Sequence, residues 1–300
     1  MGSVGCIWLF AFAMASQDLA TAVAALEAGR LDEAAGALAE IVRRRPDDPD
    51  ANYYLGLARF RQSRPQEAIS SLEQATRLSP SKPAAWKLSG LVFLGAGELQ
   101  RASVVLERAC GLDAGDEDSC YLFARSLFLL GRYEEAVKPF EQALRVAPSA
   151  NQATVHRALA LDLDEFGSTA SAEQHFREAV RLYRGSDGRP PDPRVDYGAF
   201  LVRQGRARES LDLLKAAISA APGSARANAE LGRALLELDR PEEALGPLSR
   251  AIELDPKNWG TRLLLGRAYL RVGRKDEGER QMRLGREGWS SQNSGSTKLK

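Results

Sequence analysis

Apolar residues in the stretch 50–80 fall into two blocks, each with helical spacing. Within each block they recur at intervals of three and four residues, which places them on one face of an amphipathic helix. Residues 62–65 separate the blocks, and Pro80 stops the second helix because proline lacks a backbone N–H donor. The stretch therefore predicts a unit of helix, tight turn, helix and stop.

This unit recurs along the chain with a period of 34 residues. Fixed periods of this length are typical of solenoids, and helical units make the expected fold all-α. Small residues mark each first helix, where we expect the two helices of a unit to cross with no room for a larger side chain. The series is Ala22, Gly56, Gly90, Ala124, Ala158, Gly198, Gly232 and Gly266, with one step of 40 residues before Gly198.

Each unit resembles a tetratricopeptide repeat, whose eighth residue is small, twentieth is Ala, twenty-fourth is large and apolar, twenty-seventh is Ala and thirty-second is Pro. The resemblance covers about residues 15–292 in eight consecutive units and is to repeat proteins of bacterial type. It implies a right-handed α-solenoid superhelix of stacked antiparallel helix pairs, about 16 helices in all. The twentieth residues here are Ala34, Ala68, Ala102, Ala136, Ala172, Ser210, Ala244 and Gly278.

The fifth unit breaks the rhythm because it is 40 residues long and includes the Gly- and Pro-rich segment 185–193. This segment divides the array into units 1–5, residues 16–184, and units 6–8, residues 194–289. One interpretation is a tolerated loop insertion, and the other is a weakened junction about which the two sets flex. Residues 290–300 are polar, and we expect them to form a disordered tail.

Residues 1–15 differ from the rest because their apolar run carries no charge and ends in an A-x-A-type site. This pattern predicts a secretory signal peptide, although no basic residue precedes the run. An uncleaved anchor and an apolar extension of the first helix are the alternatives. The chain is expected to be exported, periplasmic or envelope-associated if the segment is a signal, and cytoplasmic otherwise. Membrane association is expected only through this segment, if it stays uncleaved.

The overall charge is balanced, with 41 Lys and Arg against 40 Asp and Glu and a net charge of +1. No basic field therefore attracts nucleic acid, and the strict 34-residue step also argues against an RNA-binding helical repeat. No nucleotide-binding, hydrolase or metalloprotease motif is present, so we expect no enzyme activity, no cofactor and no small-molecule substrate. The only histidines, His156 and His175, lack metal-ligand spacing and are expected on solvated helix faces.

Cys110 ends the second helix of the third unit, and Cys120 begins the first helix of the fourth. These are adjacent antiparallel elements, so an exported chain could hold the two units together with a disulfide. The alternative is two small apolar packing residues in a reducing compartment.

The family resemblance implies that the first helices line a concave groove that binds a protein or peptide. The residues expected to face it combine aromatic rings with basic groups, the types that supply binding hot spots. No unit has the lysine and asparagine pair with which some family members hold a carboxylate. The expected groove residues are Tyr53, Phe60, Lys87, Tyr121, Arg125, Phe128, Arg233 and Arg267.

The leading functional hypothesis is a non-enzymatic scaffold that binds a protein segment in this groove, within an exported or envelope-associated complex. The alternative is a substrate-recognition arm or adaptor for a separately encoded enzyme, such as a glycosyltransferase or protease.

Overall fold

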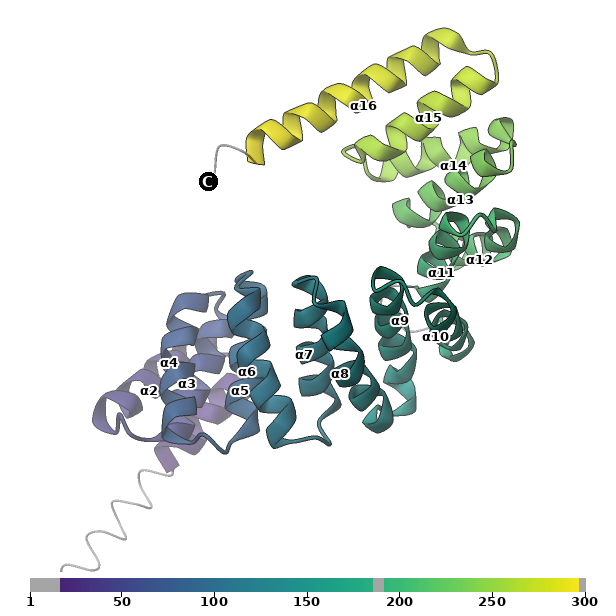
Figure 1. Ribbon diagram of the computed structural model, residues 1–300. Coiled ribbons are helices and arrows are strands. Elements are labelled where there is room, and N and C mark those ends of the chain that lie inside the picture. The colour runs from purple at the N-terminus through teal and green to yellow at the C-terminus, as the bar shows by residue number, and fades with distance from the viewer. Residues whose placement is uncertain (1–16, 186–191, 297–300) are drawn as a thin grey trace, which may run out of the picture. The chain divides into compact units, whose positions relative to one another are not determined.

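The computed structural model describes residues 17–185 and 192–296, which fold into helices joined by short turns (Figure 1). None of these residues forms a β-strand. Residues 17–27 are helical. The helices that follow are α2 (Leu31–Arg44), α3 (Pro49–Arg61), α4 (Pro65–Leu78), α5 (Pro83–Gly95), α6 (Leu99–Leu112), α7 (Glu117–Leu129), α8 (Tyr133–Val146), α9 (Ser149–Glu165), α10 (Thr169–Leu182), α11 (Pro193–Arg203), α12 (Ala207–Ala220), α13 (Ala225–Glu237), α14 (Pro241–Leu254), α15 (Trp259–Arg271) and α16 (Lys275–Ser296).

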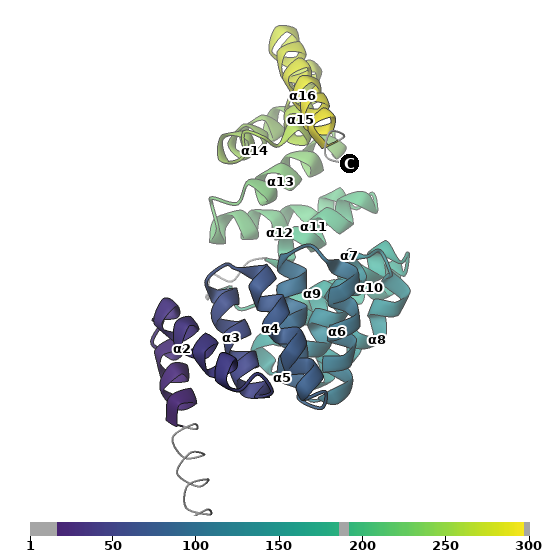
Figure 2. The same cartoon turned by 90° about the vertical axis from the view of Figure 1, so that its left-hand side faces the viewer.

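The helices pack in the pairs that the repeat predicts. The first and second helices of a repeat lie side by side, as α3 with α4, α5 with α6 and α13 with α14 (Figures 1 and 2). Within each compact unit, second helices also contact the next first helix, as α4 does with α5 and α12 with α13. The predicted all-α solenoid class is confirmed.

Small residues lie where the paired helices cross, as the sequence predicts. A Cβ atom added to Gly56 would lie 2.6 Å from Leu72 Cγ, and one added to Gly198 would lie 2.8 Å from Leu214 Cγ. Ala136 is fully buried at the equivalent crossing of α7 and α8. The backbones therefore approach too closely for a larger side chain.

The turn within each repeat requires a left-handed residue. Glycine supplies it at Gly29, Gly97 and Gly273, with φ between 75° and 78°. Two repeats lack glycine there, and Ser63 (φ 59°) and Asp239 (φ 56°) adopt the same conformation. The turn thus keeps its geometry without glycine, at a modest cost in backbone strain.

The helices form two compact units. The N-terminal unit extends to Pro148 and includes Asp162–Gly167, whereas the C-terminal unit contains Ser149–Leu161 and continues from Ser168. The boundary between compact units thus falls near α9, while the sequence suggested a division at residues 185–193. Each unit is described by itself below.

The last helix is longer than the sequence indicates. We expected a disordered tail from residue 290, but α16 extends to Ser296. Gly288 packs so closely on the Trp259 ring that a Cβ atom there would clash, which holds α16 against α15 beyond its charged segment. The Ser290 hydroxyl donates to the Arg286 carbonyl and so stays within the helix. That part of the tail prediction is wrong, and residues 297–300 lie outside the described residues.

Residues 1–15, the expected signal segment, also lie outside the described residues, as does most of the segment 185–193. In the part of the chain that the structure describes, no helix has the length and apolar character needed to cross a membrane.

Candidate functional site

The first helices α3, α5 and α7 lie next to one another in the N-terminal unit and carry most of the expected groove residues. Tyr53, Phe60 and Tyr121 are half-buried and pack against a common cluster that includes Leu88 and Leu106. The structure therefore joins three of the four expected aromatic side chains through one apolar core. Their partial exposure leaves ring surface available to a ligand.

Tyr53 lies at one end of this set. Its ring meets Tyr54 edge-on at a centroid distance of 5.1 Å, and Lys82 Nζ lies 5.6 Å from the Tyr53 centroid. Burial, together with the nearby Tyr54, raises the pKa of the Tyr53 hydroxyl above its ordinary value. The phenol therefore stays protonated near neutral pH and can donate a hydrogen bond.

Lys87 is engaged within the protein. Its Nζ lies 2.9 Å from Asp116 Oδ2 and 3.9 Å from Asp118 Oδ2, so it joins α5 to the beginning of α7. Burial of Asp116 opposes its ionisation, but hydrogen bonds from Ser119 and Lys87 outweigh burial and lower the pKa of that carboxyl. Lys87 thus has a structural role in addition to the expected groove role.

Three expected residues follow one another at helical spacing on α7 (Glu117–Leu129). Tyr121 meets Phe140 edge-on at 5.9 Å, and Phe128 lies 5.5 Å from the Tyr133 ring, so contacts with α8 hold both rings. Arg125 lies between them, is exposed, and forms no ion pair with any residue that the structure describes. We call Tyr121, Arg125 and Phe128 the α7 stripe.

The first helices of the C-terminal unit expose fewer of the positions expected to face the groove. Val195, Ala199 and Val202 occupy the same repeat positions as the three residues of the α7 stripe, but they are at most 7% exposed. They are covered because α11 packs against both α12 and α13. The expected basic residues remain available there. Arg233 is 42% exposed and lies 3.6 Å from Glu230, and Arg267 is exposed.

A buried ion cluster in the C-terminal unit was not predicted. Asp196 on α11 is 1% exposed and pairs with Arg157 on α9 and, at 2.5 Å, with Arg226 on α13. The cluster therefore joins three successive first helices. The sequence signal for this cluster was the acidic residue Asp196 on an otherwise apolar helix face.

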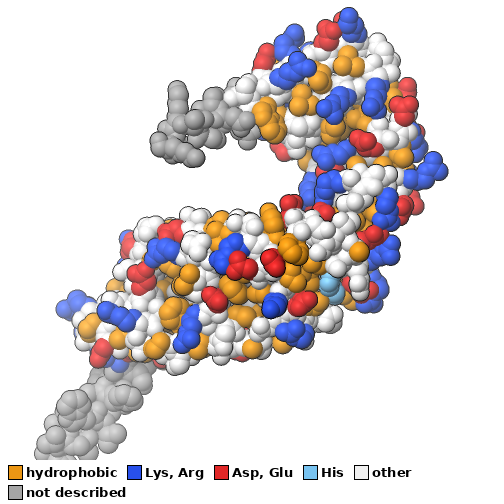
Figure 3. Space-filling model, viewed as in Figure 1, with side chains coloured by type: hydrophobic (Ala, Val, Ile, Leu, Met, Phe, Trp, Pro, Cys, Tyr) orange, Lys and Arg blue, Asp and Glu red, His pale blue; other side chains and the backbone are white. Residues whose placement is uncertain are grey.

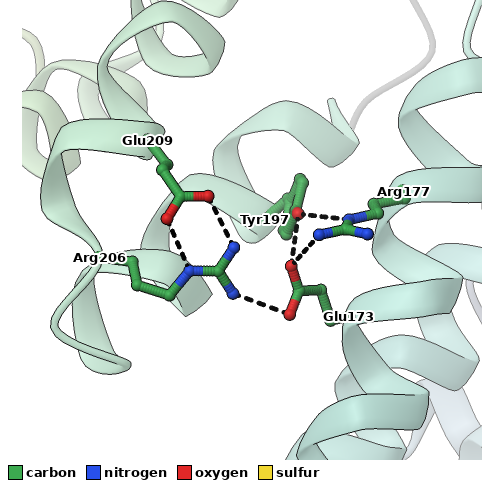
Figure 4. A network of polar contacts seen from close by, with 5 residues as sticks. All are labelled: Glu173, Arg177, Tyr197, Arg206 and Glu209. Carbon is green, nitrogen blue, oxygen red and sulfur yellow. Dashed lines mark hydrogen bonds and ion pairs between the residues drawn. The ribbon is translucent and has the colours of Figure 1, made fainter.

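A second polar network joins α10, α11 and α12 (Figure 4). Arg206 lies 2.8 Å from Glu173, and the Tyr197 hydroxyl donates to Glu173 at 3.1 Å while accepting from Arg177 at 3.1 Å. Arg206 also forms a bidentate pair with Glu209. The hydrogen bond from Arg206 is the main reason that the pKa of Glu173 falls, against the effect of burial. The network fixes the packing of these three helices.

One cavity of the N-terminal unit lies away from the α7 stripe. Its volume is about 270 Å³, and it is mainly apolar and open between α4, α5 and α6. Val104 at its edge is 59% exposed. The lining residues are Glu73, Thr76, Trp86, Ser89, Phe93, Gln100, Arg101, Val104 and Val105. This cavity was not predicted.

Cys110 and Cys120 form a disulfide in the structure, with Cα atoms 4.7 Å apart. The bond joins the end of α6 to the beginning of α7, next to the α7 stripe. Both residues are buried. Their oxidation in the cell stays a prediction.

We expected the two histidines to be separate and solvated, but the structure places them in contact. His156 on α9 and His175 on α10 place their Nδ1 atoms 2.8 Å apart, with both rings partly buried. The sequence missed this contact because the residues are 19 positions apart on different helices. Among the described residues, no group of three or more His, Cys, Asp or Glu side chains could hold a metal ion.

The fold and this surface define a helical-repeat protein of the protein-interaction class. A family model for the tetratricopeptide repeat matches residues 19–83, 57–117 and 201–258, and a second model for the same repeat matches residues 119–185. These matches cover more than half of the chain, and the chain belongs to the tetratricopeptide repeat family. Proteins of this family generally serve as non-catalytic interaction scaffolds.

Solved structures of repeat proteins are similar to this chain. One chain of the APC/C hetero-tetramer Cut9-Hcn1 has a TM-score of 0.62 at 13% identity, over 86% of this chain and 50% of that one. PilF of Pseudomonas aeruginosa has a TM-score of 0.57 at 20% identity, over 69% and 92%. MamA has a TM-score of 0.52 at 20% identity, over 56% and 91%. These identities show a shared fold alone. A comparison with curated proteins found no match.

Proposed function

We propose that this protein is a scaffold that binds a segment of another protein across the first helices of its N-terminal unit. The observation that carries the proposal is the α7 stripe, where an exposed arginine lies between two rings that their neighbours hold in place. Aromatic and arginine side chains dominate the energetics of protein interfaces. Rings that are already ordered lose little conformational entropy when a ligand binds.

The charge on the surface favours a ligand of mixed character. On the face shown in Figure 3, acidic and basic side chains of the N-terminal unit are interspersed with apolar ones. No single sign of charge dominates, in agreement with the net charge of +1. The rings offer apolar contacts, and Arg125 can pair with one acidic group of the ligand. These features suit a peptide or helix better than a polyanion.

The proposed location is outside the cytoplasm, in an envelope-associated complex. Two observations support it: the apolar run within residues 1–15, and a cysteine pair with disulfide geometry between neighbouring repeats. Disulfides persist in oxidising compartments. The similarity to a chain of the Cut9-Hcn1 hetero-tetramer supports a protein as the partner.

Affinity capture from an envelope extract tests the proposal. Wild type, Arg125→Glu and the double variant Tyr121→Ala/Arg125→Glu serve as baits. Lys138→Glu, a charge reversal at another exposed position, on α8, is the matched control. We expect a partner retained by wild type and Lys138→Glu and lost from both α7 variants. Equal recovery by all baits would refute the proposal, and an enzyme as the specific partner would favour the adaptor hypothesis.

A further inference from the structure

The cavity between α4, α5 and α6 belongs to the N-terminal unit and is not part of the proposed binding surface. The three helices lie side by side (Figure 2). Three lining residues, Trp86, Val104 and Arg101, differ from what the other repeats have at the same positions. The repeat fold explains residues that recur, but it does not explain residues that occur once. Their convergence on one cavity therefore points to a role that belongs to the third repeat alone.

Trp86 gives the cavity an aromatic side. Its Nε1 atom donates to the Pro80 carbonyl at 3.0 Å, which orients the ring. No other repeat has an aromatic residue at this position. The equivalent residues are Asp18, Asn52, Cys120, Thr154, Arg194, Asn228 and Arg262.

Val104 is an apolar side chain at a position that is otherwise polar or glycine. It is 59% exposed, the highest value among the large hydrophobic side chains of the described residues. With Val105 and Phe93 it forms an apolar wall of the cavity. Exposed apolar surface beside a cavity is typical of a binding site. The equivalent residues are Gly36, Ser70, Lys138, Gln174, Asp212, Gly246 and Arg280.

Arg101 reverses the charge that most repeats have at its position. Its Cζ atom lies 4.1 Å from the centroid of the Phe93 ring. Nη1 lies 2.6 Å from Glu98 Oε2, and Nη2 lies 2.6 Å from Glu73 Oε1 on α4. The equivalent residues are Glu33, Glu67, Glu135, Ser171, Glu209, Glu243 and Glu277.

These contacts hold the Arg101 guanidinium at both edges and support one of its faces. The side chain is nevertheless 49% exposed, so the opposite face is accessible. Aromatic rings stack on guanidinium faces. An aromatic side chain that enters the cavity can therefore stack on Arg101 and pack against Val104.

The size and floor of the cavity suit one apolar side chain. The Ser89 hydroxyl donates to the Ala85 carbonyl at 2.8 Å, and the Thr76 hydroxyl donates to the Leu72 carbonyl at 3.1 Å. Because these hydroxyl protons are already used within the helices, the floor favours an apolar group. The volume of about 270 Å³ is below the roughly 300–1,000 Å³ of sites that enclose drug-sized molecules. One large side chain of a protein fits better than a free small molecule.

The rim of the cavity carries more negative than positive charge. Glu73 is 58% exposed and Glu98 is 31% exposed, against the single guanidinium of Arg101. A basic residue of the partner can pair with Glu73 beside the apolar wall. Such pairs select a partner by its charge more than they add affinity.

We propose that this cavity is a second docking site, which takes a protein segment that inserts one aromatic side chain and places a basic residue next to Glu73. Aromatic side chains that fill a pocket are typical anchors of protein interfaces. The site lies on α4, α5 and α6, and its occupation does not depend on a ligand at the α7 stripe.

Methyl NMR of the full chain with labelled valine tests the site, with capped pentapeptides as probes. The peptide Gly-Lys-Trp-Lys-Gly supplies the aromatic anchor and basic neighbours. Gly-Lys-Ala-Lys-Gly lacks the anchor, and Gly-Glu-Trp-Glu-Gly reverses the charge. We expect the first peptide to shift the Val104 and Val105 methyl signals until they saturate, and each control peptide to bind about tenfold more weakly. Absence of these shifts, or equal binding of either control peptide, would overturn the proposal.

Variants show whether the peptide occupies this cavity. Val104→Lys and Arg101→Gln should each weaken binding of the first peptide about tenfold. Gly246→Lys adds the same charge at the same repeat position on α14, where an added Cβ atom meets nothing within 4 Å, and should leave binding unchanged. Circular dichroism checks that each variant is folded. Undiminished binding to a folded Val104→Lys variant would refute the site.

Two other occupants are outcomes of the same experiment, and either would overturn the proposal. A small aromatic amine is the occupant if tryptamine binds as tightly as the first peptide. A second copy of the chain is the occupant if dilution of the protein alone shifts the Val104 signals. Arg125→Glu should leave peptide binding unchanged, so this site and the α7 stripe can fail separately.

Discussion

Asp162 is a carboxylate where the repeat otherwise places an apolar side chain. The equivalent residues of other repeats include Leu26, Leu94 and Leu236. Asp162 is fully buried, and neither carboxylate oxygen has a hydrogen-bond partner among the described residues. Burial alone raises its pKa from 3.8 to about 7. The folded state thus disfavours the charged form that the unfolded chain adopts above pH 4.

The stability of the protein should therefore fall as the pH rises from about 4 to 7, because the unfolded chain releases the Asp162 proton first. Asp162→Leu removes this penalty and should raise the free energy of unfolding by about 1–3 kcal/mol at pH 8, and by less at pH 5. Urea denaturation at both pH values measures the difference. Asp212→Leu, at an exposed position on α12, is the control, and an equal pH dependence in both variants would contradict the explanation.

The ion cluster around Asp196 allows a second prediction about single residues, namely the loss of stability when each partner is replaced. Arg157 is only 14% exposed, so Asp196→Asn leaves a buried guanidinium without its counter-charge and should cost about 3–5 kcal/mol. Arg226 is 55% exposed, and Arg226→Gln should cost less than about 1 kcal/mol. Denaturant unfolding of both variants checks the order. Equal losses would show that Asp196 does not hold the three helices together.

At the scale of the helix pair, one ion pair recurs at the turn and was not predicted. An arginine just before the second helix pairs with a glutamate three residues later. The pairs are Arg30–Glu33, Arg64–Glu67, Arg132–Glu135, Arg206–Glu209, Arg240–Glu243 and Arg274–Glu277. Most of these side chains are substantially exposed, so each pair contributes little to stability. Their recurrence favours a role in orienting the turn.

The crossing of the two helices is where the pair tolerates change least. Ala136 is fully buried, and Ala136→Leu should overpack the contact between α7 and α8 and lower stability by roughly 1–3 kcal/mol. Thermal denaturation measures the effect. Lys138→Leu adds the same side chain to an exposed position on α8 and should change the melting temperature little. An unchanged melting temperature for Ala136→Leu would disprove close packing at this crossing.

The sequence was sufficient for features that repeat and insufficient for contacts that occur once. The small residue at Gly56 and the tight turn between the two helices of a unit follow from period and local chemistry, and both are confirmed. The Lys87–Asp116 pair and the contact of Trp259 with Gly288 depend on side chains from different helices. Such pairs leave no periodic signal. The same reason hid the histidine pair and the Asp196 cluster.

At the scale of the whole molecule, the Cys110–Cys120 disulfide links neighbouring repeats and bears on location. Replacing both cysteines by serine should lower the stability of the oxidised protein by about 2–4 kcal/mol and have little effect under reducing conditions. Thiol labelling of the exported fraction, with and without reductant, shows which form exists in the cell. Full labelling without reductant would show that the disulfide is absent in the cell, and one argument for export would then be lost.

The proposed function requires that the α7 stripe contacts a protein partner, and site-specific photocrosslinking detects that contact. A photoreactive amino acid replaces Arg125 on α7 in one variant and the exposed Lys138 on α8 in the other, both expressed in the native cell. We expect a discrete adduct of higher mass from position 125 and none from position 138. Adducts from position 138 alone, or the same adducts from both, would contradict it.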